Sequence, residues 1–95
     1  MPAYIVVDID VNNPVRYEEY KQIAPPSIAQ YGGRYLARGG HTEVLEGEWV
    51  PHRLVIVEFP TLQRAKEWHD CQEYRKARDL RHATAKSNMV VIDAP

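Results

Sequence analysis

Two carboxylates stand out in this 95-residue sequence because each closes an apolar run. Asp8 and Glu58 each share one face of an expected strand with the two apolar or aromatic residues that precede them at alternate positions. We expect these two strands to be parallel neighbours, which would place both carboxylates at the same end of the sheet. There they would raise each other's proton affinity unless a cation such as Arg34 or Arg38 lies between them. The pair is therefore either catalytic, with Glu58 or Asp8 exchanging a proton, or part of a structural salt-bridge cluster.

Histidine is the second kind of residue that could do chemistry. No two of His41, His52, His69 and His82 have the spacing that puts two metal ligands on one face of a helix or strand, so no metal site and no cofactor is predicted. His69 precedes Asp70 and Cys71, but neighbours on a helix point about 100° apart and cannot form a catalytic triad by adjacency. His41 or His69 remains a candidate to assist proton transfer from a loop or helix.

An arginine beside two glycines forms a candidate anion site. Arg38, Gly39, Gly40 and His41 are consecutive, and a guanidinium with nearby backbone N–H groups can bind a carboxylate. The spacing is not that of a phosphate-binding loop. The alternative is a strand bulge or loop corner with no ligand.

Aromatic residues at helical spacing form a candidate ligand pocket. Tyrosine offers a hydroxyl on an apolar body, and tryptophan offers a large apolar surface with one N–H donor. The residues concerned are Tyr17, Tyr20, Trp68 and Tyr74. The alternative interpretation is that all four simply fill the core.

Composition limits the classes of function. The 12 lysines and arginines against 13 aspartates and glutamates give a formal net charge of -1, which predicts neither a nucleic acid nor a membrane surface as partner. No apolar run approaches the roughly 20 residues that span a bilayer. The single cysteine excludes an internal disulfide and favours a reducing compartment, so we expect a cytoplasmic protein. The length predicts one domain, residues 1–95.

The elements that must position these residues centre on residues 53–74. An apolar, β-branched run at 54–59 predicts a buried strand that ends at Pro60, because proline cannot donate to a strand ladder. Thr61 is a suitable N-cap for a helix that ends near Cys71. Both faces of the strand carry apolar side chains, and one helix layer covers only one of them. A second subunit would be the economical source of the other cover.

The rest of the sequence predicts a split βαβ order. Residues 3–11 alternate as a strand, and Asn13-Pro14 predicts the start of a helical region that reaches Tyr31. We expect Pro25-Pro26 to divide that region into two segments. Residues 34–38, with extended structure resuming after the glycines at 41–47, predict the second strand, 72–83 a further surface helix and 87–93 the last strand. The order β-α-β-β-α-β predicts an α+β, ferredoxin-like protomer with a four-stranded antiparallel sheet and helices on one face.

The chain resembles a known family through three motifs: YGGRYLARGG at 31–40, EGEWVPHRLVIVEFP at 46–60, and Ala, Trp-His, Cys and Glu-Tyr spaced over 65–74. Together they resemble the small bacterial DUF1330 proteins of the dimeric α+β barrel superfamily, over essentially the whole chain. The resemblance implies a ferredoxin-like protomer and a homodimer whose two sheets face each other. It implies no known activity.

Two classes of function follow. The first is a homodimer that binds a small molecule. The second is a cofactor-independent enzyme, such as an isomerase, lyase or monooxygenase, acting on a small carboxylate-bearing or aromatic substrate. Whether the protein is an enzyme stays open at this point, because chemistry of this type needs only a positioned histidine, tyrosine or carboxylate.

Overall fold

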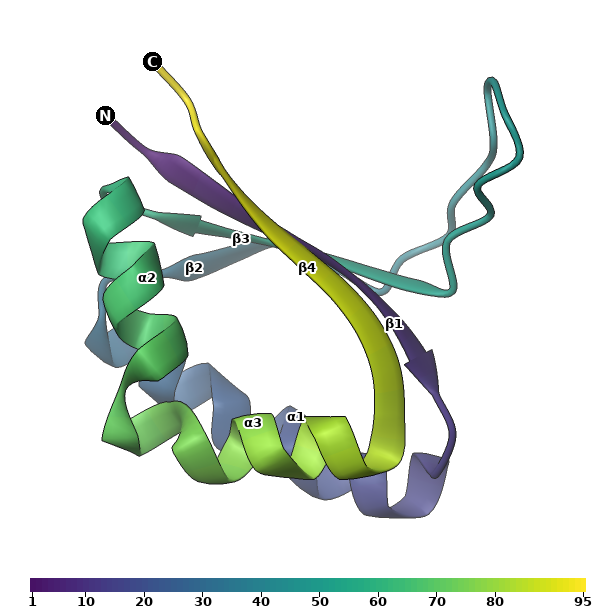
Figure 1. Cartoon of the computed structure of the whole chain (residues 1–95), viewed down its shortest axis with the longest axis horizontal. Helices are drawn as coiled ribbons and strands as arrows, with labels where there is room; N and C mark the ends of the chain where they lie inside the picture. Colours follow the sequence, from purple (N-terminus) through teal and green to yellow (C-terminus); the bar gives the residue numbers. More distant parts are fainter.

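The computed structural model describes all 95 residues as a four-stranded sheet and three helices (Figure 1). In chain order the elements are β1 (Ala3–Val11), α1 (Pro14–Gln30), β2 (Arg34–Arg38), β3 (Arg53–Phe59), α2 (Leu62–Asp70), α3 (Gln72–Thr84) and β4 (Ala85–Asp93). The predicted ferredoxin-like order is confirmed, with α3 as the additional helix before the last strand. This helix is less of a surface element than its charge suggests, since it packs on α1 and buries five of its residues.

The sheet order is β2-β3-β1-β4, and every neighbouring pair is antiparallel. The expectation that the first and third strands are parallel is wrong, because β3 inserts between the two parallel strands of the unit β1-α1-β2 and runs against both. The register places Asp8 opposite Leu54 and Tyr4 opposite Glu58. The two carboxylates are therefore four residue positions apart along the strands, roughly 13 Å.

All three helices cover one face of the sheet (Figure 1). Alternate residues of β1 and β3 point into the space beneath them, and Val55, Val57 and Phe59 are buried there. The Trp68 ring of α2 lies 5.4 Å from Phe59 and 4.0 Å from Tyr74, centroid to centroid, so it joins the sheet to two helices. This layer is the hydrophobic core of the protomer.

Both predicted helix starts are confirmed. The Asn13 side chain accepts a hydrogen bond from the Arg16 N–H at 3.2 Å, and the Thr61 hydroxyl accepts one from the Arg64 N–H at 3.1 Å. Each side chain satisfies one of the N–H groups that have no partner in the first turn. The caps fix where the chain leaves the sheet to form α1 and α2.

The predicted division of the first helical region is wrong, since α1 continues through Pro25 and Pro26. Proline has no N–H, so the Lys21 carbonyl loses the helical partner that residue 25 would supply. The Arg38 guanidinium donates to this carbonyl through Nη2 at 2.8 Å. A side chain of β2 thus takes the place of a helical hydrogen bond and joins β2 to α1.

The segment from Gly39 to His52 contains no strand, so the expectation of extended structure at 41–47 is wrong. β2 ends at Arg38, so Gly39 and Gly40 begin the loop, which is the loop-corner alternative rather than a bulge at the glycines. A register shift of the β2–β3 pairing lies earlier, between Tyr35 and Ala37. The segment returns to the sheet at Asp8, whose carboxylate accepts hydrogen bonds from Trp49 Nε1 at 2.9 Å and from the His52 N–H at 2.8 Å.

The second face of the sheet has no helix over it and carries apolar side chains. Val90 is 61% exposed and Ile92 is 58% exposed, and Val6 and Ile56 are half-buried beside them. We call this surface the open face. None of the three helices has the length and the apolar stretch that crossing a bilayer requires.

The Arg38 hydrogen bond can be tested by a double-mutant cycle with Pro25. Replacing Arg38 by Met should lower the free energy of unfolding by about 1 kcal/mol, the net worth of one hydrogen bond. In a Pro25→Ala background the loss should be smaller, because the new backbone N–H at position 25 can donate to the Lys21 carbonyl instead. Urea unfolding of the four proteins measures the loss of unfolding free energy caused by Arg38→Met in each background. Equal losses in the two backgrounds would contradict this explanation.

Candidate ligand-binding site

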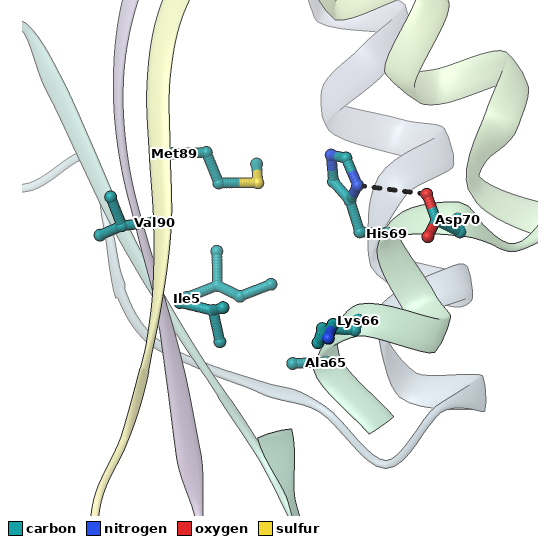
Figure 2. A pocket seen from close by; sticks show the side chains of 8 residues that line it. Ile5, Ala65, Lys66, His69, Asp70, Met89 and Val90 are labelled. Carbon is teal, nitrogen blue, oxygen red and sulfur yellow. Dashed lines mark ion pairs between the residues drawn. The ribbon is translucent and has the colours of Figure 1, made fainter. Parts of the chain in front are cut away.

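A cavity of about 240 Å³ lies between the β1–β4 side of the sheet and α2 (Figure 2). Ile5 and Met89 form its sheet wall, and the small Ala65 side chain leaves room on the helix side. Figure 2 shows Met89 pointing from β4 toward His69 of α2, while Val90 lies on the other side of the strand. The polar lining residues are Lys66, His69 and Asp70. We call this space the outer cavity.

The His69 imidazole of the outer cavity has a pKa below its usual value. Burial, and next the positive charge of Arg81, lower its pKa, and the Asp70 carboxylate, 3.6 Å from Nδ1, opposes this only in part. A histidine whose pKa lies below 6.5 is neutral at pH 7. His69 can therefore accept a proton or a hydrogen bond from a molecule in the outer cavity.

A second, inner cavity adjoins the first and shares Ile5 and Met89 with it. It lies under α1 and has a volume of about 20 Å³, room for about one water molecule. Its apolar lining is made by the sheet side chains that face the helices, together with Ile28 and Trp68. Met89 is unbranched and flexible, so a rotation of this one side chain changes the wall between the two cavities.

The polar part of the inner cavity is positively charged. Lys21, Arg38 and Arg53 line it, and no aspartate or glutamate does. The Arg38 guanidinium lies 4.5 Å from the centre of the Tyr35 ring, and that of Arg53 lies 5.9 Å from the centre of the Tyr17 ring. The Arg53 Nε is buried without a hydrogen-bond partner. Such a group loses its interactions with water and gains none within the chain.

Burial also raises the pKa of two tyrosines of this region, Tyr17 and Tyr35. It raises the pKa of Tyr35 to about 12, against the charge of Arg38, and raises the pKa of Tyr17. Both hydroxyls are therefore neutral donors at any physiological pH. The inner cavity thus combines guanidinium groups with phenol groups, a set of donors that suits an oxygen anion.

The structure brings together most of the predicted ligand-binding residues. Tyr17, Tyr20, Arg38 and Trp68 all line the inner cavity. Tyr74 lies behind them, against Trp68.

Two of the other predicted ligand-binding residues lie apart from both cavities. Gly40 and His41 are exposed on the loop, where His41 lies 3.6 Å from Glu43. Gly39 contributes indirectly: it has a φ of +71°, and a side chain there would collide with the Arg53 guanidinium. Glycine at this position therefore leaves room for Arg53.

The predicted carboxylate pair is not assembled. Glu58 lies on the open side of β3 and pairs with Arg34 at 3.0 Å, one of the two cations proposed from the sequence. Asp8 lies at the other end of the sheet, where it holds the returning loop. The two carboxylates do not share a site, so a joint proton-exchange role loses its geometric basis. Of the three predicted catalytic residues, only His69 lies at a cavity between the sheet and the helices.

Sequence reasoning missed Arg53 and Met89. Arg53 has the same strand parity as the buried Val55 and Val57, so the alternation that placed those residues under the helices also places Arg53 there. Met89 pairs with the buried Val7 on the neighbouring strand, but nothing in the sequence reveals that pairing.

The fold defines a class of protein, the ferredoxin-like α+β domains. Within this class the chain belongs to the family described as domain of unknown function DUF1330, whose model matches residues 2–95. No curated protein matches the sequence significantly.

Solved structures show the same fold at low sequence identity. The chain is similar to RPA0582, a protein of unknown function from Rhodopseudomonas palustris, with 18% identity, a TM-score of 0.80 and coverage of 99% of this chain and 82% of that chain. A dimeric ferredoxin-like protein of unknown function from Jannaschia sp. CCS1 gives 11% identity, a TM-score of 0.73 and coverage of 99% and 100%. SnoaB, a cofactor-independent oxygenase from Streptomyces nogalater, gives 11% identity, a TM-score of 0.64 and coverage of 99% of this chain and 93% of that chain.

The lowered pKa of His69 predicts how stability depends on pH. Between the folded pKa and about 6.5 the unfolded chain binds more protons than the folded one, so stability should fall as the pH drops through this window. His82, whose pKa burial and Arg81 also lower, adds to the effect. Urea midpoints measured from pH 7.5 to 5 should decrease, and His69→Gln should make the decrease shallower. An unchanged slope in this variant would contradict the assignment.

Proposed function

We propose that the protein is a homodimer that binds a small organic anion with an apolar body between its sheet and its helices. The apolar body occupies the outer cavity, and the anionic oxygen points toward the inner one. The outer volume is below the roughly 300–1,000 Å³ of sites for drug-sized molecules, so the ligand is small, such as an aromatic acid.

The observation that carries this proposal is the charge of the inner cavity. Three cationic side chains line it and no carboxylate does, in a chain whose formal net charge is -1. Lys21 is paired with Glu18, which is not part of the lining, at 3.0 Å. None of the ion pairs of the protein involves Arg38 or Arg53, whereas Arg34, on the open side of β2, is paired with Glu58. Arg38 is exposed, whereas Arg53 is half-buried. Arg53 is therefore partly withdrawn from water without a counter-charge, which favours an anionic ligand.

The open face supports the dimer. Its exposed apolar residues, among them Val90 and Ile92, would be covered if two sheets packed face to face. The similar protein from Jannaschia sp. CCS1 is described as dimeric, and the likeness to it is one of fold. The single free cysteine supports a cytoplasmic location.

A cofactor-independent enzyme is the second candidate function, and His69 is the observation that favours it. A neutral imidazole on the wall of a largely apolar cavity can remove a proton from a bound phenol or carbon acid. The two functions differ in what His69 does: an enzyme needs it for turnover, whereas a binding protein needs it at most for affinity.

Benzoate and its neutral isostere benzamide test the preference for an anion. Calorimetry should show that benzoate binds the protein more tightly than benzamide. Arg53→Gln should weaken benzoate binding about tenfold, because a hydrogen bond to a charged group is worth about 1.5–3 kcal/mol. The matched control is Arg34→Gln, which removes an arginine of the open face and should leave the affinity unchanged. Equal affinity for the two compounds would refute the proposed ligand class.

Light scattering tests the dimer. The protein at micromolar concentration should have twice the 11.0 kDa mass of the chain. Val90→Asp should produce monomers, because a two-fold axis places the new charge twice in one apolar interface. Val15→Asp, at an 85% exposed valine of α1, is the control and should remain dimeric. A folded monomer for the parent protein would contradict the assembly.

A further inference from the structure

Arg81 of α3 is a buried cation without a counter-charge. Its side chain is among the few buried polar groups, with 2% of the residue exposed, and no carboxylate forms an ion pair with it. Nη1 donates to the Tyr74 hydroxyl at 2.8 Å, Nη2 lies 3.2 Å from His82 Nε2, and Nε has no partner. Burying a guanidinium in this way is unfavourable unless its charge interacts favourably with groups nearby.

The hydrogen bonds of Tyr74 have a fixed direction. A guanidinium can only donate, so the Tyr74 oxygen accepts from Arg81. Tyr74 is 0% exposed, and the Tyr20 oxygen, 2.9 Å away, is the only other group within hydrogen-bond distance of its hydroxyl. If Tyr20 donated to Tyr74, the Tyr74 proton would be buried without an acceptor, which is costly. Tyr74 therefore donates to Tyr20.

This direction leaves the Tyr20 hydroxyl proton unused. Tyr20 lines the inner cavity, and its ring stacks on Tyr17 with 5.1 Å between centroids, which restricts where the hydroxyl can point. Hydrogen bonds in a chain polarise one another, so the charge of Arg81 strengthens the Tyr20 donor through Tyr74. The effect of Arg81 also reaches the outer cavity, where it is the second cause, after burial, of the lowered pKa of His69.

We propose that the Tyr20 hydroxyl donates a hydrogen bond to the anionic oxygen of the ligand in addition to Arg53, and that Arg81 orients and polarises this hydroxyl through Tyr74. This inference rests on the proposed binding of an organic anion and names a second group that recognises it. It assigns Arg81 and Tyr74 as positioning residues that do not contact the ligand. It also selects a ligand class: an oxygen that carries a full negative charge, as in a carboxylate or phenolate, gains more from a polarised donor than a neutral carbonyl does.

We call the chain of hydrogen bonds from Arg81 through Tyr74 to Tyr20 the relay. Two phenylalanine variants test it without altering the shape of the core. Tyr20→Phe removes the donor, and Tyr74→Phe leaves the donor but disconnects it from Arg81. Each should weaken benzoate binding about tenfold while changing benzamide binding little, so the ratio of the two affinities falls. Tyr31→Phe is the control, because the Tyr31 hydroxyl donates to Glu73 outside both cavities and its loss should leave the ratio unchanged.

A measurement without ligand tests the direction of the relay. The buried Tyr74 hydroxyl proton should be visible by NMR as a slowly exchanging resonance and should move upfield in Tyr20→Phe, which removes its acceptor. An unmoved resonance would overturn the inference whatever the ligand does. An affinity ratio that is unchanged in both phenylalanine variants, with benzoate bound by the parent, would overturn the role of Tyr20 alone. No benzoate binding by the parent protein would overturn the proposed function as well.

Discussion

The structure depends on one constraint: a four-stranded sheet has two apolar faces, and this chain supplies helices for one of them. Alternate residues of β1 and β3 bury the first face under α1, α2 and α3. The second face carries exposed side chains such as Val90 and Ile92. Side chains at consecutive strand positions point in opposite directions, so the same strands that build the core of one protomer build the proposed contact with its partner. The site and the assembly thus lie on opposite sides of one sheet.

Two carboxylates on the open side of the sheet have partners, whereas two arginines on the helix side have no carboxylate partner. On the open side Glu58 pairs with Arg34, and Asp8 accepts hydrogen bonds from the returning loop. On the helix side Arg53 and Arg81 each have a buried Nε without a partner, and neither has a carboxylate. The Tyr74 hydroxyl accepts a hydrogen bond from Arg81, and the Arg53 guanidinium lies 5.9 Å from the centre of the Tyr17 ring. An arrangement of donors without acceptors stabilises the folded chain poorly by itself but favours a bound oxygen anion.

Periodicity predicted most of the fold, because residues 3–11 alternate and Tyr17, Tyr20 and Trp68 recur at helical spacing. It also placed Tyr17 and Tyr20 on one stripe of α1 and Trp68 on the apolar stripe of α2, and both stripes face the sheet. Strand direction was not predictable from parity, which is identical for parallel and antiparallel pairs, and the proposed meeting of Asp8 and Glu58 failed for that reason. Arg81 escaped notice because it lies in a highly charged stretch that is typical of a surface helix, and its burial depends on how α3 packs in the folded chain.

The central claim is that the space between sheet and helices binds the ligand, and the two methionines of the chain allow a direct test. Met89 forms the wall shared by both cavities, whereas Met1 is 72% exposed at the terminus. Protein labelled with ¹³C at the methionine methyl groups gives one NMR signal for each. During a benzoate titration the Met89 signal should shift to saturation and the Met1 signal should stay in place. Benzoate binding, established by calorimetry, with an unmoved Met89 signal would contradict the account.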